Sequence, residues 1–230
     1  MNLIDRLHCL HRFWRYRLIT EKESFDYLLN LDLANTTCID IGANKGAYSY
    51  WLSKKSGKNG QVIAFEPQPE LTPFLEDLKQ TFDLQNLTII NKAASNESNK
   101  KSMTRKHAGH GGARIIELSP NDISIDCITL DSLLANIKST VSFIKCDVEG
   151  HELEVFQGAE SLLRMHQPII QVEIHHEAMV TGSTASFLKS LGYTGWFFIE
   201  KHRMPISQFD QYPYPRSDNH RNYFFESNSN

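Results

Sequence analysis

The sequence predicts an α/β fold built on a largely parallel sheet with helices on both faces. From residue 37 onward, short apolar runs alternate with stretches whose apolar residues recur at helical spacing. The runs are nearly continuous in apolar residues, which is typical of strands buried on both faces. Acidic residues follow several of the runs, and doubly wound sheets bind ligands beyond the carboxyl ends of their strands. These observations predict one α/β domain with a ligand site at that end of the sheet.

Seven apolar runs are expected to form the strands of this sheet. They occupy residues 37–41, 62–65, 87–91, 141–146, 168–174, 193–199 and 222–225. The intervening stretches with helical spacing include residues 69–82, 128–137, 153–163 and 184–191. In a doubly wound sheet the first and fourth strands flank the point where the strand order reverses, so their ends are expected to face one crevice.

Two segments do not follow this alternation. Residues 1–35 are expected to form a helical extension, whose first helix carries four arginines at positions 6, 12, 15 and 17. We interpret it as a helix packed on the domain with a solvated basic face, and a membrane-surface or partner-docking helix is the alternative. Residues 95–127 are polar and glycine-rich, and we interpret them as an insertion or hairpin near the ligand cleft. The α/β domain is expected to cover residues 36–230.

The composition argues against a nucleic-acid-binding, a membrane-spanning or a secreted protein. The 230 residues carry a net charge of −3, whereas a nucleic-acid binder is expected to be strongly basic. No apolar run is long enough to span a bilayer, and the first residues do not resemble a secretory signal. The four cysteines lack the spacing of a metal site and predict reduced, buried thiols. We therefore expect a cytoplasmic protein that acts without nucleic acid or a transmembrane segment, with a homodimer left open.

The strongest local pattern is the segment IDIGANKG at residues 39–46. Gly42 and Gly46 allow a tight turn between a strand and a helix, and they let a ligand approach the backbone. A pyrophosphate site has a glycine at the position of Asn44, so this turn suits a nucleoside ligand without phosphates. S-adenosylmethionine (SAM) is such a ligand.

Two carboxylates at strand ends complete the expected cofactor site. Asp40 ends the first strand and is expected to face the amino or sulfonium end of SAM. Glu66 ends the second strand about twenty residues beyond the turn, where a carboxylate accepts both ribose hydroxyls. The alternative is a purely structural turn with two surface carboxylates. It is disfavoured because open α/β sheets bind ligands at these strand ends.

The chemistry is expected to come from the ends of the fourth and fifth strands. Methyl transfer from a sulfonium requires in-line alignment of acceptor and methyl group, and a hydroxyl acceptor also needs a base. The candidate bases are Asp147, Glu149, His151 and His175. The two histidines are preferred because imidazole titrates near neutral pH. Asp147 is equally a candidate for orienting the turn or contacting the cofactor.

Further polar residues are expected around the acceptor. The candidate acceptor contacts are Glu173, His176 and His110. Asp147, Glu173 and His175 have the oxygen and imidazole groups that several divalent metals accept. Their spacing is not diagnostic of a metal site, so we do not favour a metal.

Five segments resemble, in order, the motifs of FkbM-type methyltransferases. They are IDIGANKG, VIAFEPQPE, ITLDSLL, FIKCDVEGHELEVFQGAESLL and PIIQVEIHHE. The resemblance runs from residue 37 to the last expected strand, and residues 147–159 are its most specific part. It implies a Rossmann-like class I SAM-dependent fold, whose seven-stranded sheet has an antiparallel last strand. It also implies O-methylation of a hydroxyl on a small molecule or sugar.

By motif position, the resemblance implies cofactor contacts at Asp40, Gly42, Asn44, Gly46 and Glu66. It implies further polar groups of the active-site crevice at Asp147, Glu149 and Glu173, with their roles open. The basic first helix and the loop at residues 107–114 depart from the family pattern. Two other functions are weighed against this one. A NAD-dependent oxidoreductase is disfavoured by Asn44, and a non-catalytic SAM-binding scaffold is disfavoured by the intact set of acidic strand ends.

Overall fold

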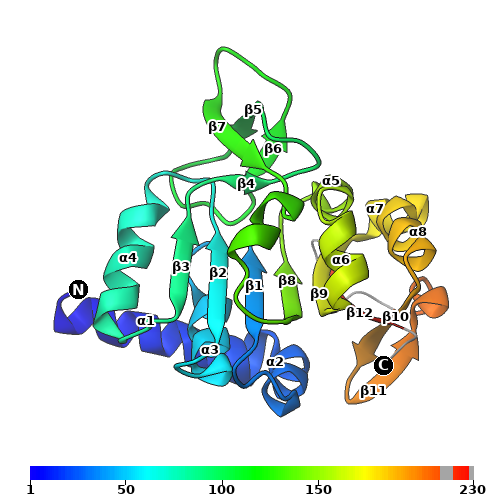
Figure 1. The fold of residues 1–230 in the computed structure, drawn as a ribbon, viewed down its shortest axis with the longest axis horizontal. Coiled ribbons are helices and arrows are strands. Elements are labelled where there is room, and N and C mark those ends of the chain that lie inside the picture. Colours follow the sequence, from blue (N-terminus) through cyan, green and yellow to red (C-terminus); the bar gives the residue numbers. More distant parts are fainter. Residues whose placement is uncertain (213–219, 228–230) are drawn as a thin grey trace.

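An eight-stranded mixed sheet forms the centre of the structure, a computed structural model that describes residues 1–212 and 220–227 (Figure 1). The strand order is β11-β10-β12-β9-β8-β1-β2-β3. The bounds are β1 Thr37–Ile41, β2 Gln61–Phe65, β3 Leu87–Ile90, β8 Val141–Cys146, β9 Ile169–His175, β10 Tyr193–Ile199, β11 His202–Pro205 and β12 His220–Ser227. Strands β1, β2, β3, β8 and β9 are parallel, and β12 runs antiparallel between β9 and β10. The predicted α/β sheet with an antiparallel last strand is therefore confirmed.

The sheet has one strand more than the seven that were predicted. The additional strand is β11, which forms an antiparallel hairpin with β10 at the edge of the sheet. Ile199 pairs with His202, so Glu200 and Lys201 make a two-residue turn, in which Glu200 adopts a φ of +52°. Three of the four residues of β11, His202, Arg203 and Pro205, are exposed, and only Met204 packs partly against the core. Pairing with β10, rather than burial of apolar side chains, therefore makes this segment a strand.

Helices cover both faces of the sheet, as predicted. Their bounds are α1 Leu3–Arg15, α2 Lys22–Asn30, α3 Ala47–Ser56, α4 Leu71–Thr81, α5 Glu152–Gln157, α6 Glu160–His166, α7 His176–Thr181 and α8 Ser183–Ser190. Alternate residues of a strand point to opposite faces. Cys38 of β1 therefore packs in a core with α1 to α4, whereas Ile39 packs in a core with α5, α6 and α8.

The N-terminal helices pack on the domain through aromatic side chains. Phe13 of α1 stacks on Tyr50 at 4.6 Å between ring centroids, and Phe25 of α2 stacks on Tyr48 at 4.5 Å. A π-helical turn at Tyr16–Thr20 joins the two helices. Nowhere in the described part of the chain does a helix combine the length and apolarity needed to cross a membrane.

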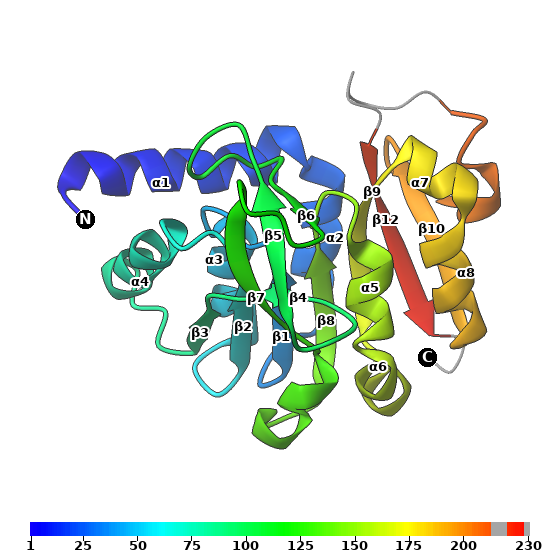
Figure 2. The same ribbon diagram turned by 90° about the horizontal axis from the view of Figure 1, so that it is seen from above.

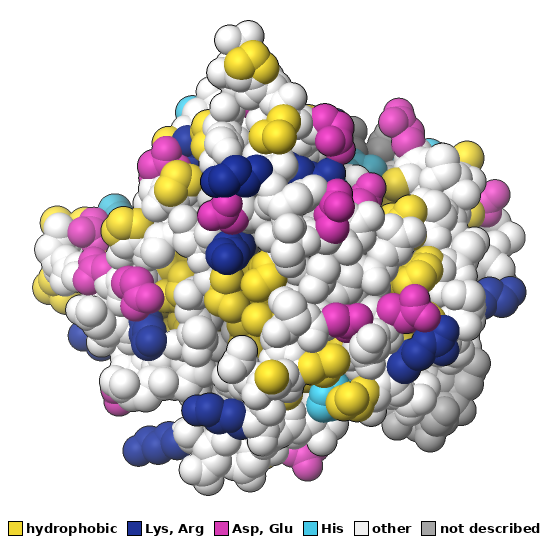
Figure 3. Space-filling view, turned by 45° about the horizontal axis from the view of Figure 1, so that its top comes forward, with side chains coloured by type: hydrophobic (Ala, Val, Ile, Leu, Met, Phe, Trp, Pro, Cys, Tyr) yellow, Lys and Arg dark blue, Asp and Glu magenta, His cyan; other side chains and the backbone are white. Residues whose placement is uncertain are grey.

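A smaller sheet lies beyond the carboxyl ends of the main parallel strands (Figures 1 and 2). It comprises β4 Ala93–Ala94, β5 Lys100–Thr104, β6 Arg114–Ile116 and β7 Ile123–Ile128. Met103, Ile125 and Cys127 bury their side chains in a cluster of its own. Seen from this end, acidic and basic side chains are interspersed over the surface (Figure 3). Strands β4, β5 and β6 contribute side chains to the cavity described next.

Candidate active site

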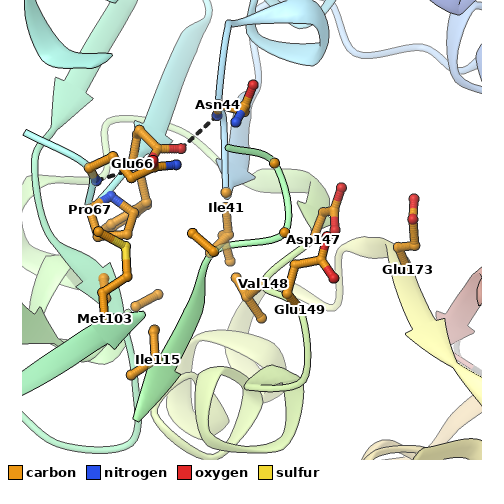
Figure 4. Close-up of a pocket in the computed structure, with 18 of the residues that line it drawn as sticks. Ile41, Asn44, Glu66, Pro67, Met103, Ile115, Asp147, Val148, Glu149 and Glu173 are labelled. Atoms are coloured by element: carbon orange, nitrogen blue, oxygen red, sulfur yellow. Dashed lines mark hydrogen bonds between the residues drawn. The ribbon is translucent and has the colours of Figure 1, made fainter. Parts of the chain in front are cut away.

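A cavity of about 220 Å³ lies at the carboxyl ends of β1, β2, β8 and β9, under the smaller sheet. Its apolar wall includes Ile41, Phe65, Met103 and Ile115. In Figure 4, Glu66 and Pro67 lie on one side of the cavity, and three further carboxylates lie on the other. These three are Asp147, Glu149 and Glu173.

The glycine turn after β1 is shaped by its contact with the turn after β8. Gly42 has a φ of +81°, and a Cβ there would lie 1.9 Å from the carbonyl oxygen of Asp147. Only glycine therefore allows the two turns to approach this closely. Asn44, with a φ of +46°, also lies in the left-handed region, which asparagine tolerates better than most residues. Gly46, with a φ of +73°, precedes α3 and would contact Leu75 if it carried a Cβ.

Glu66 is fixed by the backbone on both sides of it. The amide of Asn44 donates to its Oε2 at 2.7 Å, and the amide of Gln68 donates to its Oε1 at 2.9 Å. The side chain is only 3% exposed, and burial raises the pKa of its carboxyl group. A carboxylate has about four lone-pair positions, so these two bonds leave acceptor capacity for a ligand in the cavity.

The three carboxylates on the opposite wall repel one another. Burial raises the pKa of Asp147 well above its usual range, and the nearby charges of Glu173 and Glu149 raise it further. Lys145, behind them on β8, is buried, with its Nζ 3.9 Å from Glu173 Oε2. Burial alone would lower the pKa of Lys145, but the surrounding carboxylates outweigh that effect and raise it. The wall therefore suits a ligand that brings positive charge.

Two of these carboxylates are each paired with a histidine. His175 Nε2 lies 3.0 Å from Glu149 Oε2, and His220 Nε2 lies 3.0 Å from Glu173 Oε1. Glu149 has a φ of +56°, a backbone conformation that costs energy for a residue with a side chain. Such conformations concentrate at functional sites, which makes the turn after β8 a candidate for the chemistry.

Asp40 lies in an adjoining cavity of about 60 Å³ rather than in the main one. The hydroxyl of Ser49 donates to its Oδ2 at 2.5 Å. Burial raises the pKa of Asp40 to about 6. The two cavities share Gly42, Asn44 and Asp147 among their lining residues, so Asp40 is next to the turn, as expected.

None of the four predicted histidines lines the cavity wall, although His175 contacts Glu149, which does. His151 lies with its Nε2 2.9 Å from Ser95 Oγ, at the start of α5. His176 packs near Phe209, with 5.9 Å between ring centroids. The backbone carbonyl of His110 accepts a hydrogen bond from Gln68, and it is the two following glycines that line the cavity.

Several polar residues of the site were not predicted from the sequence. Glu21, between the π-helical turn and α2, lines the cavity and accepts hydrogen bonds from Tyr48 Oη at 2.5 Å and Asn222 Nδ2 at 2.9 Å. Lys145 donates to the same asparagine at 2.9 Å. A lysine inside the mostly apolar run at 141–146 was a signal that could have identified this network. In the described ranges, no group of three His, Cys, Asp or Glu side chains is arranged to hold a metal ion.

Comparison with known proteins gives consistent matches. Residues 40–194 match the family described as the methyltransferase FkbM domain. Hexuronic acid methyltransferase AglP of Haloferax volcanii is 28% identical over 170 residues, which cover 72% of this chain and 67% of that relative.

Solved methyltransferase structures share the fold. The FkbM methyltransferase of Methylobacillus flagellatus matches with a TM-score of 0.60 at 17% identity, over 87% of this chain but only 46% of that one. The present chain thus spans less than half the length of that protein. A putative methyltransferase of Streptococcus mutans, in complex with S-adenosylhomocysteine (SAH), matches with a TM-score of 0.53 at 10% identity, over 89% of this chain and 96% of that one. These likenesses confirm the predicted class I methyltransferase fold.

Proposed function

This chain belongs to the FkbM methyltransferase domain family, and from that premise we propose that it transfers a methyl group from SAM to a hydroxyl of a saccharide or other small molecule. The observation that carries the proposal is that two groups of residues with different chemistry line one cavity. One is the glycine turn with Glu66, which suits a nucleoside. The other is the wall of Asp147, Glu149 and Glu173, whose mutual repulsion a sulfonium would relieve.

The residues around the turn are assigned to SAM. Glu66 would accept the ribose hydroxyls with the lone pairs that Asn44 and Gln68 leave free. Asp40 and Asp147 would face the positively charged amino and sulfonium groups. The SAH complex of the Streptococcus mutans neighbour supports a nucleoside of this kind on the same fold.

The acceptor is assigned to the side of Glu173 and His220. A neighbouring cavity of about 410 Å³ shares these two residues and Glu21 with the SAM cavity. Phe198 and Ile199 give it an apolar wall, against which the carbon skeleton of an acceptor could pack. The hexuronic acid methyltransferase named among the relatives supports a saccharide hydroxyl as the acceptor.

Glu149 is assigned as the base. The acceptor oxygen attacks the methyl carbon, so a C–O bond forms while the C–S bond breaks and neutral SAH leaves. The hydroxyl proton passes to the Glu149 carboxylate. His175, 3.0 Å from that carboxylate, would position it and stabilise its charge. His151, which lies against Ser95 outside the cavity lining, has no part in this scheme.

The proposal is tested by binding and turnover measured separately. SAH and NADH are titrated into the protein by calorimetry, and SAH release from SAM is then followed with a panel of hexoses, hexuronic acids and simple alcohols. We expect SAH to bind and its release to depend on one class of acceptor. Binding of NADH but not SAH would favour an oxidoreductase. SAH binding without release on any member of a broad panel would favour a non-catalytic scaffold.

A further inference from the structure

The N-terminal helical segment forms part of the space around the glycine turn. The cavity of about 60 Å³ that contains Asp40 is also lined by residues of α1 and of the π-helical turn. It shares five lining residues with the SAM cavity: Tyr16, Glu21, Gly42, Asn44 and Asp147. A ligand that lies along the turn would therefore extend from the larger cavity towards this smaller one.

Arg12 of α1 lines the small cavity and carries an unsatisfied donor. Its Nη1 atom is buried and has no hydrogen-bond partner among the residues that the structure describes. Leaving a buried charged donor without a partner is costly, because the group has lost its hydrogen bonds to water. The carboxylates that line the same cavity do not relieve that cost. Asp40 accepts a hydrogen bond from Ser49, and Glu21 accepts from Tyr48 and Asn222.

The charges around the small cavity are of both signs. Asp40, Asp147 and Glu21 supply negative charge, and Arg12 is accompanied by Lys45 and Lys145. Lys145 already donates to Asn222 and is surrounded by carboxylates. A group that carries a positive and a negative substituent on the same carbon atom would complement such a lining, whereas a purely cationic or anionic group would not.

We infer that Arg12 binds the α-carboxylate of the methionine moiety of SAM, while the neighbouring acidic residues face its ammonium group. This inference rests on the proposed function and adds a cofactor-binding residue from outside the matched family domain, which begins at residue 40. A guanidinium pairs with a carboxylate through two parallel hydrogen bonds, which fixes orientation as well as adding affinity.

The local structure of the segment agrees with this role. The backbone leaves the α-helical path directly after Arg15, and the amide of Glu21 donates to the carbonyl of Tyr16 at 2.9 Å across the wider turn. π-helical turns of this kind are frequent at functional sites. Here the turn lets Arg12 and Glu21, on either side of it, line the same small cavity.

The test uses two ligands that differ only in the carboxylate. SAM and decarboxylated SAM are titrated by calorimetry into the wild-type chain and into Arg12→Met. We expect the wild-type chain to prefer SAM about 10- to 100-fold, the effect of one charge-assisted pair. In Arg12→Met the affinity for SAM should fall by that factor, with the affinity for decarboxylated SAM unchanged. Arg15→Met, an exposed arginine of the same helix, is the matched control and should keep the preference.

The other outcomes separate the competing explanations. If Arg12→Met weakens both ligands equally, the arginine acts only through the structure of the helix and the inference is wrong. It is also wrong if Lys45→Met removes the preference and Arg12→Met does not. If the wild-type chain binds neither ligand, the proposed function itself fails, and this inference fails with it.

Discussion

Glu66→Gln tests the placement of the cofactor with the smallest change of shape. Both carboxylate oxygens of Glu66 accept backbone amides, from Asn44 at 2.7 Å and Gln68 at 2.9 Å. A glutamine has one oxygen, so its NH₂ group must face one of these donors. The variant loses one charge-assisted hydrogen bond, and we expect its free energy of unfolding to fall by about 1.5 to 3 kcal/mol. Urea unfolding followed by circular dichroism measures this change.

The same substitution should weaken cofactor binding by a comparable amount. The ribose hydroxyls would lose a charged acceptor, which corresponds to about a 10- to 150-fold increase in the Kd of SAH. Calorimetry on the folded variant measures it, with the exposed Glu177→Gln as the control that should bind SAH like the wild-type chain. If folded Glu66→Gln binds SAH within about twofold of the wild-type chain, Glu66 does not contact the ribose and our orientation of SAM is wrong.

Three further predictions concern the turn, the buried acid and the base. Gly42→Ala would place a Cβ 1.9 Å from the Asp147 carbonyl oxygen, and should lower the free energy of unfolding by at least about 3 kcal/mol. The control is Gly182→Ala, where φ is +67° and a Cβ would meet its nearest atoms at an ordinary 3.8 Å; it should cost only the left-handed strain, about 1 kcal/mol, in the same urea titration. Because burial raises the pKa of Asp40 to about 6, the folded state favours its protonated form, so stability is lost as the pH rises from about 4 through 6. The free energy of unfolding of Asp40→Asn, measured relative to that of the wild-type chain, should therefore rise by up to about 3 kcal/mol between pH 4 and 7. A difference that does not change with pH would contradict this. Glu149→Gln should lower kcat about 100-fold or more with little change in the Kd of SAH, and wild-type turnover would exclude it as the base.

The parallel strands were predictable because they are buried on both faces. Such strands consist of continuous apolar runs, and the bounds of two of them agree with the expected ranges to the residue: 37–41 and 141–146. Strand β11 could not be predicted in this way, because it is exposed and is held by pairing with its neighbour. The apolar pattern of a sequence predicts strands that bury apolar surface. It does not predict a strand that is formed mainly by hydrogen bonds to its neighbour.

The carboxylates of the site were easier to predict than its histidines. A residue that ends a parallel strand has its position set by the sheet, so Glu66 and Asp147 were expected at one crevice and lie there. His151 comes four residues later, after two residues with positive φ, Glu149 and Gly150, which direct the chain away from the cavity. Glu21 was missed for the opposite reason. It is distant in sequence and reaches the site only because the N-terminal helices pack across the sheet.

The position of β12 has a consequence for how the protein is made. This strand is the last described element of the chain, yet it lies inside the sheet, between β9 and β10. A ribosome delivers the N-terminal part first, so the nascent sheet has a gap with two unpaired edges until residues 220–227 emerge. That strand also carries Asn222, which donates a hydrogen bond to Glu21, and His220, which pairs with Glu173. Methyl transfer should therefore begin only after residues 220–227 have joined the sheet, and the two unpaired strand edges are the surface that chaperones would bind before that moment.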